Sequence, residues 1–92
     1  MIDELEIKEV VAERLLAYRE STGLSRREVS ELVDVPEKTL YRIENNNTEF
    51  VPKLSTLIIL CNFYEKSLSD LFETYFSARF THPIMKDKKE EI

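Results

Sequence analysis

Residues 25–45, SRREVSELVDVPEKTLYRIEN, decide how this chain folds. Ser25 is followed three residues later by Glu28, a pairing typical of the capping box that begins a helix. The apolar spacing that follows predicts a helix that reaches Val33. The next segment, Asp34-Val35-Pro36, leaves room only for a tight connection.

A second short helix is predicted directly after this connection. Proline is tolerated at the first position of a helix, so we expect this helix to run from about Pro36 to Asn45. Leu40 and Ile43 lie three residues apart and form its inward-facing pair. Two short helices joined by a turn of about three residues have helix-turn-helix geometry.

Helical periodicity predicts three more helices around this pair. They span about Asp3 or Glu4 to Ser21, Pro52 to Tyr64, and a last stretch that starts after Ser67 and continues to Phe80. The residues expected to face inward are Ile7, Val10, Val11, Leu15 and Tyr18, then Leu54, Leu57, Ile58, Cys61 and Tyr64, then Leu68, Leu71, Phe72, Tyr75, Phe76 and Phe80. No strand pattern competes, so the predicted fold class is all-α: a compact five-helix domain with an extended C-terminal helix.

Length and composition narrow the class of protein. Ninety-two residues make one small domain, and one glycine with three prolines favours helices over an all-β fold. The longest apolar run, Leu57–Cys61, is too short to span a membrane, and the acidic N-terminus is unlike a signal peptide. A single cysteine fits a reducing compartment. We therefore expect a cytoplasmic protein with no membrane association.

The net charge of −5 is unusual for a protein that binds nucleic acid. Its distribution matters more than its total, because residues 25–53 hold five of the thirteen basic side chains. These are Arg26, Arg27, Lys38, Arg42 and Lys53.

Five short motifs follow one another along the chain in register and without gaps. They are Arg14-Leu15-x-x-Tyr18-Arg19, Gly23-Leu24-Ser25-x-x-Glu28-Val29, Val35-x-x-x-Thr39-Leu40-x-x-Ile43-Glu44-Asn45, Pro52-x-Leu54-x-Thr56-Leu57 and Ser67-x-x-x-Leu71. Together they resemble the Cro/phage-repressor (Xre-type) helix-turn-helix family over nearly two thirds of the chain. The resemblance implies a DNA-binding domain over 1–73, with its family core at about 14–71. Residues 74–92 then form a C-terminal extension that holds a dimerisation segment and a charged tail.

The resemblance implies a sequence-specific DNA-binding regulator of transcription. We expect a repressor that places its third helix in the major groove of a short palindromic operator on double-stranded DNA. By position in the family, the residues expected to contact bases are Arg26, Glu37, Lys38, Thr39 and Arg42. Those expected to contact phosphates are Ser25, Asn45, Asn47 and Thr48. Arg19 and Glu44 stand where the family has a structural salt bridge.

Several residues depart from the family pattern. Arg26 stands where glutamine is usual, and Pro36 replaces a serine or threonine cap. Asp34 and Asn46 replace glycines, and both residue types tolerate a positive φ better than most. Glu65-Lys66 replaces Gly-Val, which leaves open whether that corner is rebuilt. The base preference therefore does not follow from the resemblance.

The C-terminal aromatic residues have two open explanations. Phe72, Tyr75, Phe76 and Phe80 are expected to form a homodimer interface, which would match a two-fold operator. Alternatively, they fold back onto the N-terminal residues Ile2 and Leu5. Left uncovered, this many aromatic side chains would be unfavourable.

Other classes of function fit the sequence less well. The alternative to a DNA-binding regulator is a protein-interaction module on the same fold, such as an antitoxin-like protein that binds another protein. The glutamates are spread over helix surfaces without a nucleophile, so no enzymatic activity is expected. No spacing typical of metal ligands and no glycine-rich phosphate loop occurs, so no metal or cofactor is expected. His82 and Cys61 are expected to be a loop residue and a buried thiol.

Overall fold

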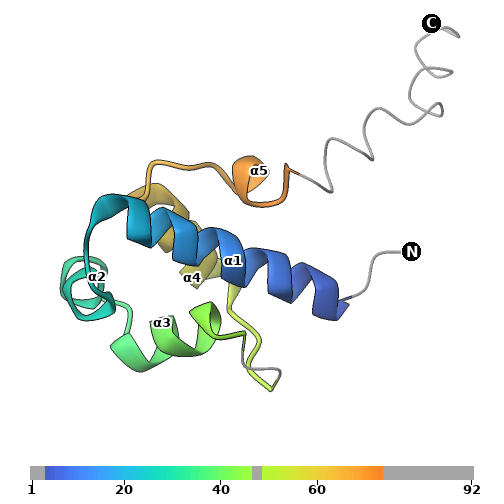
Figure 1. Cartoon of the computed structure of the whole chain (residues 1–92), viewed down its shortest axis with the longest axis horizontal. Helices are drawn as coiled ribbons and strands as arrows, with labels where there is room; N and C mark the ends of the chain where they lie inside the picture. The colour runs from blue at the N-terminus through green and yellow to red at the C-terminus, as the bar shows by residue number, and fades with distance from the viewer. Residues whose placement is uncertain (1–3, 47–48, 74–92) are drawn as a thin grey trace, which may run out of the picture.

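The structure, a computed structural model, describes residues 4–46 and 49–73 of the 92. Its helices are α1 (Glu4–Thr22), α2 (Arg26–Val33), α3 (Glu37–Glu44), α4 (Leu54–Phe63) and α5 (Leu68–Leu71). No strand occurs in the described ranges, and the all-α prediction is confirmed. In Figure 1 the long helix α1 crosses the domain, with the α2–α3 pair on one side of it and α5 on the other. None of the described helices has the length and apolar character needed to cross a membrane.

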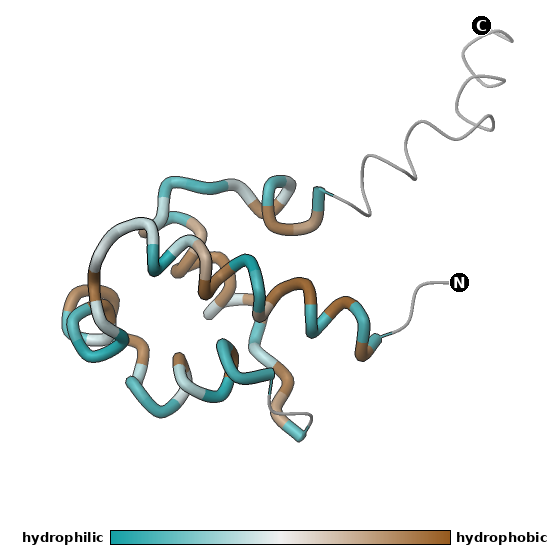
Figure 2. The backbone as a smooth tube through the Cα atoms, in the orientation of Figure 1, coloured by the Kyte–Doolittle hydropathy of each residue, from teal (hydrophilic) through white to brown (hydrophobic). Residues whose placement is uncertain are grey.

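One hydrophobic core joins all five helices. Its buried members are Val11, Leu15, Val29, Val35, Leu40, Ile43, Leu57, Leu60, Cys61, Tyr64 and Leu71. Figure 2 shows brown, apolar stretches along α1 and α4. α1 packs on α3 and α5, while α4 packs on α2 and α5. Burial of these side chains supplies most of the stability of so small a domain.

The face of α4 that is buried differs from the prediction. Leu57, Cys61 and Tyr64 are buried as expected, but Leu54 and Ile58 are exposed, and the core includes Leu60 instead. Ten residues of α4 contain no charged side chain, so no polar stripe marks the solvent side of the helix in the sequence. The phase of the buried face therefore comes from contacts with other helices.

Both helices predicted to start at a proline start later. Pro36 is the N-cap of α3, with ψ of 141°, and the first helical residue is Glu37. The carbonyl of Pro36 accepts hydrogen bonds from the backbone N–H groups of Thr39 and Leu40, so it closes the first turn from outside the helix. Pro52 precedes Lys53, the N-cap of α4.

Serine caps mark the starts of α2 and α5, as predicted. Ser25 Oγ accepts from the Glu28 N–H at 3.1 Å, and the Glu28 carboxylate accepts from the Ser25 N–H at 2.8 Å. Ser67 and Asp70 repeat this reciprocal capping box at 2.9 and 2.8 Å. These hydrogen bonds with Ser67 lower the pKa of Asp70.

Three turns place residues other than glycine in the left-handed region. Asp34 ends α2 with φ of 60°, and Asn46 follows α3 with φ of 52°. Glu65 also has φ of 60°, and the next N–H, that of Lys66, donates to the carbonyl of Cys61 at 2.8 Å. The corner at Glu65 therefore keeps a left-handed, helix-ending residue despite the loss of glycine.

The predicted extension of the last helix is only partly covered. α5 ends at Leu71, and Phe72 follows it as a half-buried residue packed on the core. The other three aromatic residues of the expected interface, Tyr75, Phe76 and Phe80, lie outside the described residues.

Candidate nucleic-acid interface

Helix α3 has an apolar underside and a polar outer face. Leu40 and Ile43 are buried in the core and hold the helix against the domain. Side chains that can donate or accept hydrogen bonds lie on the remaining positions: Glu37, Lys38 and Tyr41 are exposed, and Thr39 and Arg42 are half-buried. This face offers the mixture of charge, hydroxyl and aromatic groups that direct readout of base edges requires.

The connection between α2 and α3 is held from beneath. Asp34, in its left-handed conformation, donates its N–H to the carbonyl of Ser30 and ends α2 abruptly. Val35, in the middle of the connection, is buried in the core together with Val29 of α2. The relative orientation of α2 and α3 is therefore fixed by packing rather than by the loop alone.

A buried carboxylate ties α3 to the rest of the domain. Glu44, whose side chain is 3% exposed, accepts hydrogen bonds from Arg19 Nε at 2.8 Å and from Arg19 Nη2 at 3.0 Å. Arg19 Nη1 also donates to the carbonyl of Leu24 at 2.8 Å. The hydrogen bond with Glu44 raises the pKa of the Arg19 guanidinium. This bidentate pair joins the end of α1, the loop before α2 and the end of α3.

The same carboxylate also binds a second arginine, which the sequence gave no reason to expect. Arg26 Nη1 donates to Glu44 Oε1 at 3.1 Å, and its guanidinium carbon lies 5.2 Å from the centroid of the Tyr41 ring. The Arg26 side chain is 32% exposed. Because one carboxylate faces two guanidinium groups, this junction of α2 and α3 carries surplus positive charge that faces solvent.

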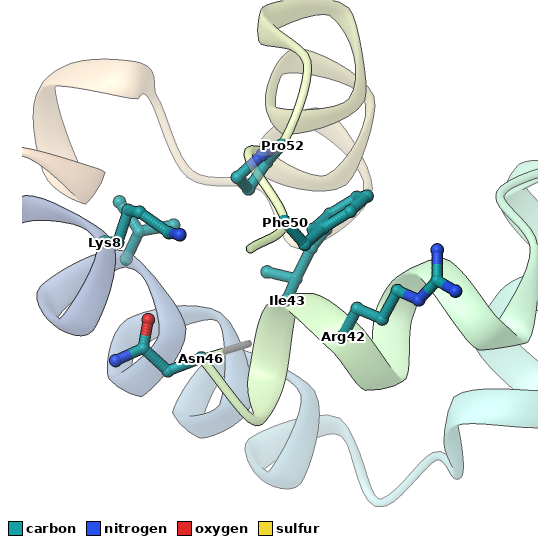
Figure 3. A pocket seen from close by; sticks show the side chains of 7 residues that line it. Lys8, Arg42, Ile43, Asn46, Phe50 and Pro52 are labelled. Atoms are coloured by element: carbon teal, nitrogen blue, oxygen red, sulfur yellow. The ribbon is translucent and has the colours of Figure 1, made fainter. Parts of the chain in front are cut away.

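Arg42 is held by an aromatic contact at the other end of α3. Its guanidinium carbon lies 5.9 Å from the centroid of the Phe50 ring, and Figure 3 shows the two side chains beside one another. They line a hollow with Ile43 and Pro52 whose volume is only about 10 Å³, room for roughly one water molecule. The hollow is therefore not a ligand site, and Phe50 acts as a support for Arg42.

The residues expected to contact phosphates are only partly described. Ser25 Oγ accepts the capping hydrogen bond from Glu28, and Asn45 Nδ2 donates to the carbonyl of Tyr41 at 2.9 Å. The hydroxyl hydrogen of Ser25 and the second amide hydrogen of Asn45 are not needed for these bonds. Asn47 and Thr48 lie outside the described residues.

Comparison with known proteins agrees with this geometry. A family model described as a helix-turn-helix matches residues 15–71, more than half of the chain. The chain belongs to the Cro/C1-type (Xre-like) helix-turn-helix family. This match agrees with the predicted family core and supports a DNA-binding regulator of transcription; the family is regulatory, not catalytic. Comparisons with curated proteins and with solved structures find no significant match.

Outside α2 and α3, the helix-turn-helix domain shows little that suggests further chemistry. Burial raises the pKa of the Cys61 thiol and raises the pKa of Tyr64 to about 12, so both groups stay protonated at neutral pH. Within residues 4–46 and 49–73, no group of three His, Cys, Asp or Glu side chains is placed to hold a metal ion.

Proposed function

We propose that this helix-turn-helix protein binds a short palindromic operator through α3 and represses transcription by occupying it. The observation that carries the proposal is the Glu44 network. Glu44 joins α1, α2 and α3 through Arg19 and Arg26, so the polar face of α3 is presented on a rigid support. A rigid support lowers the entropy lost when a helix enters the major groove.

The roles proposed for individual residues follow from their chemistry. Lys38 and Arg42 suit guanine, Glu37 suits the amino group of cytosine, and Thr39 suits the methyl group of thymine. Arg26 reaches the DNA with the guanidinium N–H groups that Glu44 does not engage. The proposed phosphate contacts are Ser25, Asn45, Asn47 and Thr48.

The dependence of affinity on salt tests this function. Phosphate contacts release counterions, so the logarithm of the affinity for duplex DNA should fall linearly with the logarithm of the salt concentration. Fluorescence anisotropy of a labelled duplex across a salt series measures the slope. A slope of zero, or no binding at low salt, would contradict the proposal and favour the antitoxin-like alternative, in which the partner is a protein.

Replacement of Lys38 by alanine is expected to relax the preference for one base pair of the operator. A bidentate contact to a base edge gives about 1–3 kcal/mol of discrimination, so binding to the preferred sequence should weaken roughly 5- to 150-fold. Binding to unrelated duplexes should change much less. The matched control is Lys66→Ala, which removes the same charge beside α5; equal losses in the two variants would exclude a base contact by Lys38.

We also propose that the protein is a homodimer and that Phe72, Tyr75, Phe76 and Phe80 contribute to its interface. Phe76→Asp is expected to lower the oligomeric state, because a carboxylate would be buried without a partner. Light scattering coupled to size-exclusion chromatography measures the molar mass of the variant and of the natural chain. Identical masses for both would place the interface elsewhere.

A further inference from the structure

Helix α4 leaves an apolar surface uncovered by the part of the chain that the structure describes. Leu54 is 62% exposed and Ile58 40%, and they lie one helical turn apart on the same side of α4. Val51, just before the helix, is 64% exposed. These three residues are called the α4 patch below. α4 contains no charged residue, although 34% of the chain is charged.

A hollow adjoins the α4 patch. Its volume is about 230 Å³, and its apolar lining includes Val51 of the patch with Val11, Leu57 and Phe72. Apolar cavities of about 150 Å³ admit a molecule as large as benzene, so this hollow has room for an aliphatic side chain of a partner. Protruding side chains beside a receiving hollow make the surface able to complement a copy of itself.

A second hollow, of about 300 Å³, lies against Ile59 but also includes Thr39 of α3. Thr39 belongs to the surface proposed to contact bases. A protein partner seated in this hollow would compete with DNA. We therefore restrict the partner surface to the first hollow and the α4 patch.

We propose that the α4 patch is a two-fold interface with a second copy of this chain. Two copies each carry a net charge of −5 and repel one another wherever acidic surfaces meet, so association needs an uncharged surface such as this one. The rim of the hollow carries one acid, Glu4, and one base, Lys8, which adds no net charge. Phe72 lines the hollow and belongs to the dimer interface proposed above, so the two surfaces are continuous. The inference rests on the dimer of the proposed function and names its contact surface.

The experiment compares Leu54→Glu with Leu32→Glu in the full-length chain. Leu32, on α2, is 65% exposed, so the two variants add the same charge at leucines of nearly equal exposure. Each substitution occurs twice in a two-fold dimer, so Leu54→Glu is expected to weaken dimerisation by about 100-fold or more. Light scattering across a concentration series should show a monomer for Leu54→Glu and a dimer for Leu32→Glu. Circular dichroism checks that both variants remain folded.

Three outcomes would overturn the inference: a monomeric natural chain, a Leu54→Glu variant that dimerises as the natural chain does, or equal weakening by both substitutions. A monomeric natural chain would instead favour coverage of the hollow by its own residues 74–92. DNA binding is scored separately. The monomeric Leu54→Glu variant should bind a single half-site with the salt slope of the natural chain and lose its tighter binding to the palindrome. Absence of DNA binding by the natural chain would contradict the proposed function without changing the dimerisation result.

Discussion

Replacement of Glu44 by alanine is expected to lower the free energy of unfolding by about 3–5 kcal/mol. The carboxylate is almost fully buried and faces Arg19 and Arg26, so its removal leaves the guanidinium of Arg19 largely buried without its carboxylate partner. For a domain of this size the loss corresponds to a decrease in Tm of at least about 12 °C.

Thermal unfolding followed by circular dichroism measures this effect. Glu37→Ala is the matched control, because Glu37 is an exposed glutamate at the other end of α3 and is expected to change the stability by no more than about 0.5 kcal/mol. An unchanged Tm for Glu44→Ala would contradict the structural role of the carboxylate.

Replacement of Leu40 by alanine is expected to destabilise the domain by about 2–5 kcal/mol. Leu40 is among the most deeply buried side chains and anchors α3 to the core, so the substitution leaves a cavity under the DNA-binding helix. Urea unfolding compares this variant with Leu32→Ala, which truncates an exposed leucine on α2. Leu32→Ala should lie within about 0.5 kcal/mol of the natural chain. Equal effects at Leu40 and Leu32 would mean that α3 is not held by the core.

The start of α2 and the position of α3 were predictable because local chemistry determines them. The capping box of Ser25 and Glu28 sets the first residue of α2, and the Asp34–Pro36 connection limits where α3 begins. The solvent side of α4 was not predictable from local pattern. A helix without charged residues gives no polar stripe, so Leu54 and Leu60 look equivalent until neighbouring helices bury one of them.

The candidate site shows the same division. The pairing of Arg19 with Glu44 followed from the family resemblance, because both positions match its pattern. The contacts of Arg26 with Glu44 and Tyr41 did not follow, because Arg26 replaces the usual glutamine and meets residues from another helix. A signal was present in the departure itself: a new guanidinium at the start of α2 needs an acceptor, and the carboxylate at the end of α3 lies within its reach.

Selection of the purified protein on a randomised duplex DNA library at moderate salt tests the central claim most directly. The account predicts enrichment of a palindrome whose half-sites lie about one helical turn apart, since a two-fold dimer places two copies of α3 in successive major grooves. Enrichment of a single asymmetric half-site would contradict the symmetric dimer. No enrichment, with only weak retention that disappears with salt, would contradict sequence-specific DNA binding by α3.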